Sequence, residues 1–230
     1  MATTSVPAPR SALLGRAFAG VLLDLDGTLV DSIASVERSW RTWAAEYGVD
    51  PARLRHGVTA ANLVAELLPP EQRAAAHDRI VALEVADVAG ITLLPGAAEL
   101  LDELGDGGAR VAIVTSGSRP LAEARLAATG LRRPDVVVTA DDVVRGKPGP
   151  EPYLVAAREL DVEPADCVAV EDALAGLVSA RDAGVGGALA VTTTTPADEL
   201  AALADAVVGG LDEVRATVDR GTGSVRLLSR

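Results

Sequence analysis

The apolar positions of this chain follow two alternating patterns, short continuous runs and longer stretches with helical spacing. Continuous apolar runs of strand length are typical of strands buried on both faces of a parallel sheet. The runs occupy residues 17–25, 110–115, 135–139, 167–170 and 187–191. Helical patterns lie between the later runs, at residues 121–129, 151–160 and 173–183. Because strands and helices alternate, the sequence predicts an α/β fold with a parallel sheet and helices on both faces.

The stretch between residues 32 and 94 departs from this alternation because it contains helical patterns and no convincing strand. Its three predicted helices occupy residues 32–47, 59–68 and 71–89. Several glycines and the Pro69-Pro70 pair punctuate them. A helical insertion after the first strand indicates a lid or cap. We therefore expect a loose N-terminal tail (1–16), an α/β core (17–31 and 95–230) and a helical cap domain (32–94).

Composition restricts the possible partners of the chain. Of its 230 residues, 49% are hydrophobic, which is enough for one sizeable core with a smaller companion. The formal net charge is −12, so neither nucleic acid nor an anionic membrane surface would be attracted to the molecule. An anionic substrate must therefore be met by a local positive group or by a metal ion.

The single cysteine, Cys167, cannot form an internal disulfide, and no apolar run approaches the roughly 20 residues that span a bilayer. The first 16 residues also lack an apolar stretch long enough for a signal peptide. We therefore expect a cytoplasmic chain that does not act at membranes.

Polar residues follow four of the predicted strands, at the point where each strand ends. In an open parallel sheet, ligands bind beyond the carboxyl ends of the strands, so these residues should converge on one crevice. They are Asp24 and Asp26 after the first strand, Ser116 and Gly117 after the second, Lys147 after the third, and Glu171 and Asp172 after the fourth.

This combination of groups suits phosphoryl transfer with a hard divalent cation. Asp24 and Asp172 are candidate ligands of Mg²⁺, which typically takes one or two carboxylates together with waters and substrate phosphate. Ser116 and Lys147 are candidates to hold the phosphate oxygens. Lys147 is the only lysine, since the other 20 of the 21 basic residues are arginine. A compact ammonium is not interchangeable with a guanidinium where space is tight, so we interpret Lys147 as functional.

Four segments, DLDGTLVDS, VTSGS, GKPGPEPY and VEDA, occur in this order with the helical insertion after the first. They resemble the four motifs of the haloacid dehalogenase (HAD) superfamily, in its branch with a small helical cap (subfamily IA). The resemblance covers roughly residues 18–215 and implies a Rossmann-like core. Within the superfamily, the chain is most similar to phosphatases of small sugar and polyol phosphates, including glycerol-3-phosphatase-like enzymes. This finer resemblance rests on VDSIASVERSWRTWAAEYG, GITLLPGA and VTSGSRPLAEAR.

The resemblance implies a role for each acidic residue. Asp24 would be the nucleophile that forms an aspartyl-phosphate, and Asp26 the general acid that protonates the leaving alkoxide and then activates water. Mg²⁺ would be held by the Asp24 carboxylate, the Asp26 backbone carbonyl and Asp172. Glu171 would either bind the ion or support its ligands.

The resemblance also implies a phosphate-binding group. Ser116, Gly117 and Lys147 would bind the phosphate, and Lys147 would in addition restrain Asp24. Ser118 and Pro120 form a helix-capping signal just after this group, so a serine here can serve the following helix as well.

The predicted cap offers His56, Gly57 and Thr59 as candidates for substrate contact. A closing cap excludes water and reads the leaving group, and His56 is suited to donate a hydrogen bond to a sugar hydroxyl. An exposed histidine at a helix end explains His56 equally well. Trp40 and Trp43 are three residues apart on one helix face, which favours packing inside the cap over sugar stacking.

The sequence therefore predicts a Mg²⁺-dependent phosphatase of small sugar or polyol phosphates, with two alternatives. A phosphoglucomutase of the same branch would need a cap arginine for a second phosphate, and the resemblance places it after a Gly-Val-Ser stretch. The corresponding run here is Gly57-Val58-Thr59-Ala60, and Ala60 cannot bind a phosphate, which favours hydrolysis. The other alternative is a binding or regulatory module that has lost the chemistry. Neither the exact substrate nor the oligomeric state can be derived from the sequence.

Overall fold

The computed structural model describes residues 13–54 and 59–230. Its centre is a six-stranded sheet in the order β6-β5-β2-β7-β8-β9, and every neighbouring pair is parallel. The strands are β2 (Gly20–Leu23), β5 (Arg110–Val114), β6 (Val136–Val138), β7 (Cys167–Glu171), β8 (Gly187–Val191) and β9 (Ala206–Val208). The α/β fold expected from the apolar runs is confirmed, and β2 lies near the middle of the sheet.

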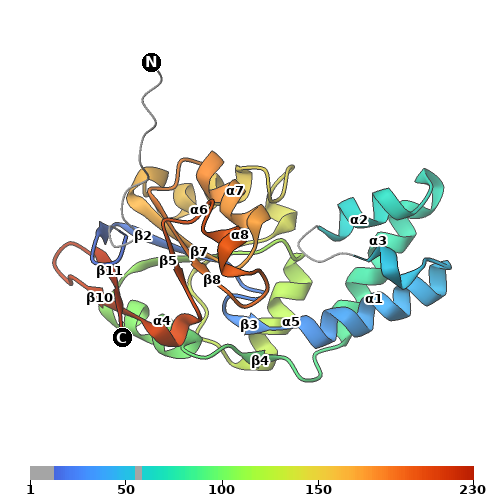
Figure 1. Ribbon diagram of the computed structural model, residues 1–230, viewed down its shortest axis with the longest axis horizontal. Helices are drawn as coiled ribbons and strands as arrows, with labels where there is room; N and C mark the ends of the chain where they lie inside the picture. Colours follow the sequence, from blue (N-terminus) through green and yellow to red (C-terminus); the bar gives the residue numbers. More distant parts are fainter. Residues whose placement is uncertain (1–12, 55–58) are drawn as a thin grey trace, which may run out of the picture.

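Helices cover both faces of this sheet (Figure 1). They are α4 (Ala97–Gly107), α5 (Arg119–Thr129), α6 (Glu151–Glu159), α7 (Leu174–Asp182) and α8 (Ala197–Leu200). In β2, Val21 and Leu23 belong to the apolar cluster that includes α4 and α5, whereas Leu22 belongs to the cluster that includes α6 and α7. Alternate side chains of a strand point to opposite faces, so one continuous apolar run serves both clusters.

Three further helices, α1 (Ile33–Tyr47), α2 (Ala60–Leu67) and α3 (Pro70–Ala86), stand to one side of the sheet in Figure 1. We call them the cap helices. They enclose an apolar cluster of their own, in which Trp43 is completely buried and donates a hydrogen bond of 2.8 Å from its indole to the Ala76 carbonyl. The short helix η1 (Pro51–Arg53) follows α1.

The expectation of no strand between residues 32 and 94 is wrong at one point. β4 (Thr92–Leu93) pairs antiparallel with β3 (Val30–Asp31), so the chain segments that enter and leave the cap helices are hydrogen-bonded to each other. Two residues are too short to leave a periodic pattern in a sequence.

A second sheet was not expected from the sequence. It has the order β1-β11-β10 and is antiparallel, formed by β1 (Ala17–Phe18), β10 (Val214–Val218) and β11 (Val225–Ser229). The apolar run at 17–25 is therefore divided between two sheets, because its first residues pair with β11 and the next pair with β5 and β7. The remaining short helices are η2 (Ala140–Asp142), η3 (Pro164–Asp166) and η4 (Leu211–Glu213). Over the described residues, the structure contains no helix with the length and apolar character needed to cross a membrane.

Candidate active site

Asp24 stands directly after β2, and the backbone turns sharply beyond it. The Asp24 amide donates to the Val170 carbonyl at 3.0 Å, which continues the pairing of β2 with β7 by one residue. Gly27 then adopts a φ of +88°, and a Cβ placed on it would lie only 2.1 Å from Asp172 Oδ2. Only glycine satisfies both the conformation and the close approach. The loop after β2 is thereby held against the carboxylate that follows β7.

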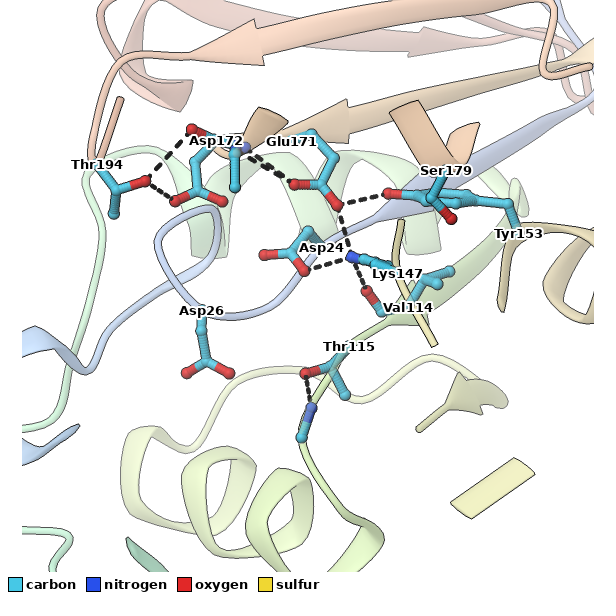
Figure 2. Close-up of polar contacts among 12 residues, drawn as sticks. Asp24, Asp26, Val114, Thr115, Lys147, Tyr153, Glu171, Asp172, Ser179 and Thr194 are labelled. Atoms are coloured by element: carbon cyan, nitrogen blue, oxygen red, sulfur yellow. Dashed lines mark hydrogen bonds and ion pairs between the residues drawn. The ribbon is translucent and has the colours of Figure 1, made fainter. Parts of the chain in front are cut away.

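Lys147 connects Asp24, just after β2, to Glu171 at the end of β7 (Figure 2). Its Nζ donates to Asp24 Oδ1 at 2.7 Å, to Glu171 Oε1 at 2.5 Å and to the Val114 carbonyl at 2.8 Å. These three bonds use every donor of the ammonium, so its position is fixed. The Tyr153 hydroxyl donates to Glu171 Oε1 at 2.7 Å from α6.

Three buried carboxylates gather around this lysine. Asp24, Glu171 and Asp172 each offer an oxygen, and these oxygens all lie within 4.8 Å of one another. Burial and the charge of Glu171 raise the pKa of Asp24 well above its usual range, against the opposing effect of Lys147. Burial and Glu171 likewise raise the pKa of Asp172 to about 7, although a hydrogen bond from Thr194 opposes the shift. The negative charge in this group therefore exceeds what one lysine compensates.

The surroundings of Lys147 favour its charged form. Burial alone would lower its pKa, but the carboxylates of Asp24 and Glu171 outweigh burial, and the pKa is raised. Lys147 therefore carries its positive charge throughout the neutral range.

The segment after β5 lines a cavity with a volume of about 700 Å³. Ser116 and Gly117 line this cavity together with Asp24 and Lys147. The Gly117 amide donates to Thr115 Oγ1 at 3.0 Å, so it would have to share or leave this bond to bind a phosphate.

The expected side-chain cap at the start of α5 is not present. Ser118 is the N-cap residue of this helix, but its hydroxyl accepts no hydrogen bond from the first turn and has no partner among the described residues. The prediction was correct about the helix start and wrong about how the serine serves it.

Asp26 points away from the Lys147 network in Figure 2 and has partners of its own. Its Oδ1 accepts a hydrogen bond of 2.7 Å from Ser32 Oγ, and its Oδ2 is paired with the Arg125 guanidinium. The Arg125 side chain is only 4% exposed. Sequence reasoning missed Arg125, although an arginine on the buried face of α5, beside Leu121 and Leu126, is a detectable signal.

Comparison with known proteins identifies the family of the chain. A profile of the haloacid dehalogenase-like hydrolases matches residues 18–184. The chain belongs to this family. Its resemblance to the superfamily and its expected fold are both confirmed.

Two characterised relatives are phosphatases by name. The chain is 45% identical over 171 residues to hexitol phosphatase A of Escherichia coli (strain K12), covering 72% of this chain and 79% of the relative. It is 39% identical over 207 residues to validoxylamine A 7'-phosphate phosphatase of Streptomyces hygroscopicus subsp. limoneus, covering 84% and 94%. Among solved structures, CbbY from Rhodobacter sphaeroides in complex with phosphate has a TM-score of 0.72 and 31% identity, covering 85% of this chain and 96% of CbbY.

The acidic group fits the divalent metal ion that hydrolases of this family generally use. Asp24, Glu171 and Asp172 supply only oxygen atoms, the ligands that hard cations prefer. The raised pKa values of Asp24 and Asp172 are a second indication, because a cation among these carboxylates would relieve their mutual repulsion.

The cap residues predicted to contact substrate are only partly described. His56 and Gly57 lie outside the described residues. Thr59 is the N-cap of α2, where its hydroxyl accepts a hydrogen bond from the Asn62 amide at 3.2 Å, and it also lines the cavity. Two other cap residues that line the cavity, His77 and Glu84, were not selected as contact residues from the sequence.

Proposed function

We propose that this protein is a Mg²⁺-dependent phosphatase that hydrolyses small sugar or polyol phosphate monoesters through an aspartyl-phosphate on Asp24. The observation that carries this proposal is that Asp24 and Ser116 line the same cavity of about 700 Å³, where Lys147 holds one oxygen of Asp24. Membership of the hydrolase family and the names of the two phosphatase relatives support it.

In the first step, the Asp24 oxygen that is not held by Lys147 attacks the phosphorus atom. The bond from phosphorus to the leaving oxygen breaks, and the Asp26 carboxyl delivers a proton to that oxygen as the alcohol departs. Lys147 keeps Asp24 in line and, with Ser116, faces the charge that spreads over the phosphoryl oxygens.

In the second step, Asp26 accepts a proton from water and the water oxygen attacks the same phosphorus atom. The bond to Asp24 breaks, so inorganic phosphate is released and both aspartates return to their starting states. Asp24, Asp172 and the Asp26 carbonyl would hold Mg²⁺, with Glu171 beside them, and the bound ion would supply positive charge that neutralises the phosphoryl oxygens.

The domain division belongs to the same proposal. Residues 32–94 would act as a cap that closes over an α/β core formed by 17–31 and 95–230. The expected tail at 1–16 is wrong for its described part, because Leu13 is buried in the core and the Gly15 amide donates to the Leu227 carbonyl at 2.8 Å. The separate apolar cluster of the cap helices and the β3–β4 pairing at their base support this division. Contact with substrate through His56, Gly57 and Thr59 remains a prediction of this scheme.

The test is release of inorganic phosphate from a panel of sugar and polyol phosphates, with Mg²⁺ and with EDTA. Asp24→Asn removes the nucleophilic oxygen while keeping the shape, and we expect it to lower kcat by at least about 10³-fold. Asp78→Asn is the matched control, because it makes the same change on an exposed side chain of α3. Release that continues in Asp24→Asn, or that ignores EDTA, contradicts the mechanism.

The panel also separates the two alternatives. A phosphoglucomutase would convert β-glucose 1-phosphate in the presence of a bisphosphate activator without releasing phosphate. A catalytically silent module would do neither.

A further inference from the structure

Glu84 is a buried carboxylate that the proposed chemistry does not use. It lies on α3 and is only 7% exposed. The other buried carboxylates of the described chain, Asp24, Glu171 and Asp172, all belong to the acidic group beside Lys147. Glu84 lines the same cavity as they do, from the side of the cap helices.

Burying this carboxylate is costly. Burial raises the pKa of Glu84 to about 7, and the charge of Asp26 acts in the same direction. Arg125 and a hydrogen bond from Trp40 oppose the shift without cancelling it. Within the described residues, Arg125 gives its ion pair to Asp26, and no residue forms an ion pair with Glu84. A leucine would fill this position without the cost, so packing alone does not explain a glutamate here.

Arg125 presents a complementary feature from the core. Its Nη1 is engaged by Asp26, but its Nε is buried and has no acceptor in the part of the chain that the structure describes. Because α3 packs against α5, the Arg125 guanidinium and the Glu84 carboxylate lie near each other where the cap helices adjoin the core. The guanidinium has an unused donor, and the carboxylate can accept further hydrogen bonds. A hydroxyl group both donates and accepts hydrogen bonds, so it can satisfy the two together.

The cavity provides the room for such a ligand. Asp24, Ser116, Glu84 and Arg125 all line it, and its volume of about 700 Å³ is typical of small-molecule sites. A phosphate placed beside Asp24 leaves the rest of the cavity for the alcohol to which it is esterified.

We propose that Glu84 and Arg125 bind hydroxyl groups of the leaving alcohol, so that the enzyme selects polyhydroxylated phosphate esters over esters of plain alcohols. This inference rests on the proposed phosphatase function and specifies its substrate class. Glu84 accepts hydrogen bonds from the hydroxyls, and the Arg125 guanidinium donates to them. Glu84 is therefore a specificity-determining residue contributed by the cap helices.

The experiment compares kcat and KM for glycerol 3-phosphate, sorbitol 6-phosphate and n-propyl phosphate. Propyl phosphate has the carbon chain and alkoxide leaving group of glycerol phosphate but no hydroxyls, so the ratio of their kcat/KM values isolates hydroxyl recognition. Because Glu84→Leu removes hydrogen bonds to a charged group, it should lower this ratio by about 10- to 100-fold, chiefly through KM. Glu84→Gln should lower it less, because its amide oxygen still accepts. Asp78→Asn on the same helix should leave the ratio unchanged.

The outcomes separate this inference from the proposed function. Wild-type protein that releases no phosphate from these esters or from the panel of sugar and polyol phosphates contradicts the phosphatase itself. Wild-type protein that hydrolyses propyl and glycerol phosphates equally well overturns the hydroxyl site alone, as does an equal loss on both esters in Glu84→Leu. Should the leucine variant fail to fold, the glutamine variant, which keeps the shape of Glu84, gives the same comparison, and an unchanged ratio there overturns the proposal.

Discussion

Replacing the Glu84 carboxylate by an amide tests the electrostatics of the cap helices directly. The pKa of Glu84 is about 7 in the folded protein, against 4.5 for an ordinary glutamate. Below pH 4.5 the side chain is protonated in both the folded and the unfolded chain, so it contributes no difference. As the pH rises, the unfolded chain ionises first, and stability is lost until the folded carboxyl has also ionised above pH 7.

The expected magnitude follows from this difference. Each pKa unit corresponds to 1.36 kcal/mol, so the raised pKa of Glu84 destabilises the native state by about 3 kcal/mol at pH 8. At pH 5 the same calculation gives a destabilisation of only about 1 kcal/mol. A glutamine side chain at this position would carry no charge and should avoid this cost. Glu84→Gln is therefore expected to raise the free energy of unfolding by about 3 kcal/mol at pH 8 and by about 1 kcal/mol at pH 5.

The assay is urea denaturation followed by far-UV circular dichroism, with EDTA present so that metal binding does not contribute. Wild type and variant are compared at each pH, so titration of the other groups cancels. Asp78→Asn, on the same helix but with an exposed side chain, should change stability by less than about 0.5 kcal/mol at both pH values. A Glu84→Gln protein that is no more stable than wild type at pH 8, or whose gain is the same at pH 5, refutes the reasoning.

Three further outcomes test the proposed mechanism. Asp26→Asn should accumulate a covalent phosphate on Asp24 when given an aryl phosphate, because an aryl oxide leaves without a proton but the second step still needs a base. Intact-protein mass spectrometry that finds no added phosphoryl group contradicts the role of Asp26 as that base. Mg²⁺ should raise the melting temperature more at pH 8 than at pH 6, because Asp172, with a pKa of about 7, must lose its proton to bind the ion; equal shifts at both pH values argue against that ligand. Gly27→Ala should lower the free energy of unfolding by at least about 1 kcal/mol, since its φ is +88° and its Cβ would strike Asp172, and a variant as stable as wild type in urea would show that the loop relaxes.

The sequence predicted which polar residues lie close together, because parallel-sheet topology converts order along the chain into proximity. Asp24, Lys147 and Glu171 are far apart in sequence, yet each stands where a strand ends or in the loop beyond it. Once the strands are recognised from their apolar runs, their carboxyl ends must meet at one edge of the sheet. The antiparallel sheet of β1, β10 and β11 had no comparable signal, since β1 has only two residues and β10 and β11 are partly exposed.

Glu84 could not be selected from the sequence for a physical reason. In the segment RIVALEVAD it occupies one polar position in a helical pattern, and such positions usually face solvent. Its burial arises only when α3 packs against α5, a contact between helices that no local periodicity encodes. Arg125 is the more detectable partner, because a charge on the apolar face of α5 conflicts with the local pattern, and such conflicts gather at functional sites.

The two predictions about Glu84 constrain each other. If the carboxylate costs stability and also selects hydroxylated substrates, then Glu84→Gln should be the more stable and the less selective protein. If Glu84 were purely structural, Glu84→Gln would not change substrate selectivity. If Glu84 bound substrate but had an ordinary pKa, the variant would show no pH-dependent gain in stability. Glu84→Gln should therefore show both a stability gain that grows with pH and a smaller preference for polyol over propyl esters. Only this combination supports the conclusion that the Glu84 carboxylate destabilises the protein and is retained because it binds substrate.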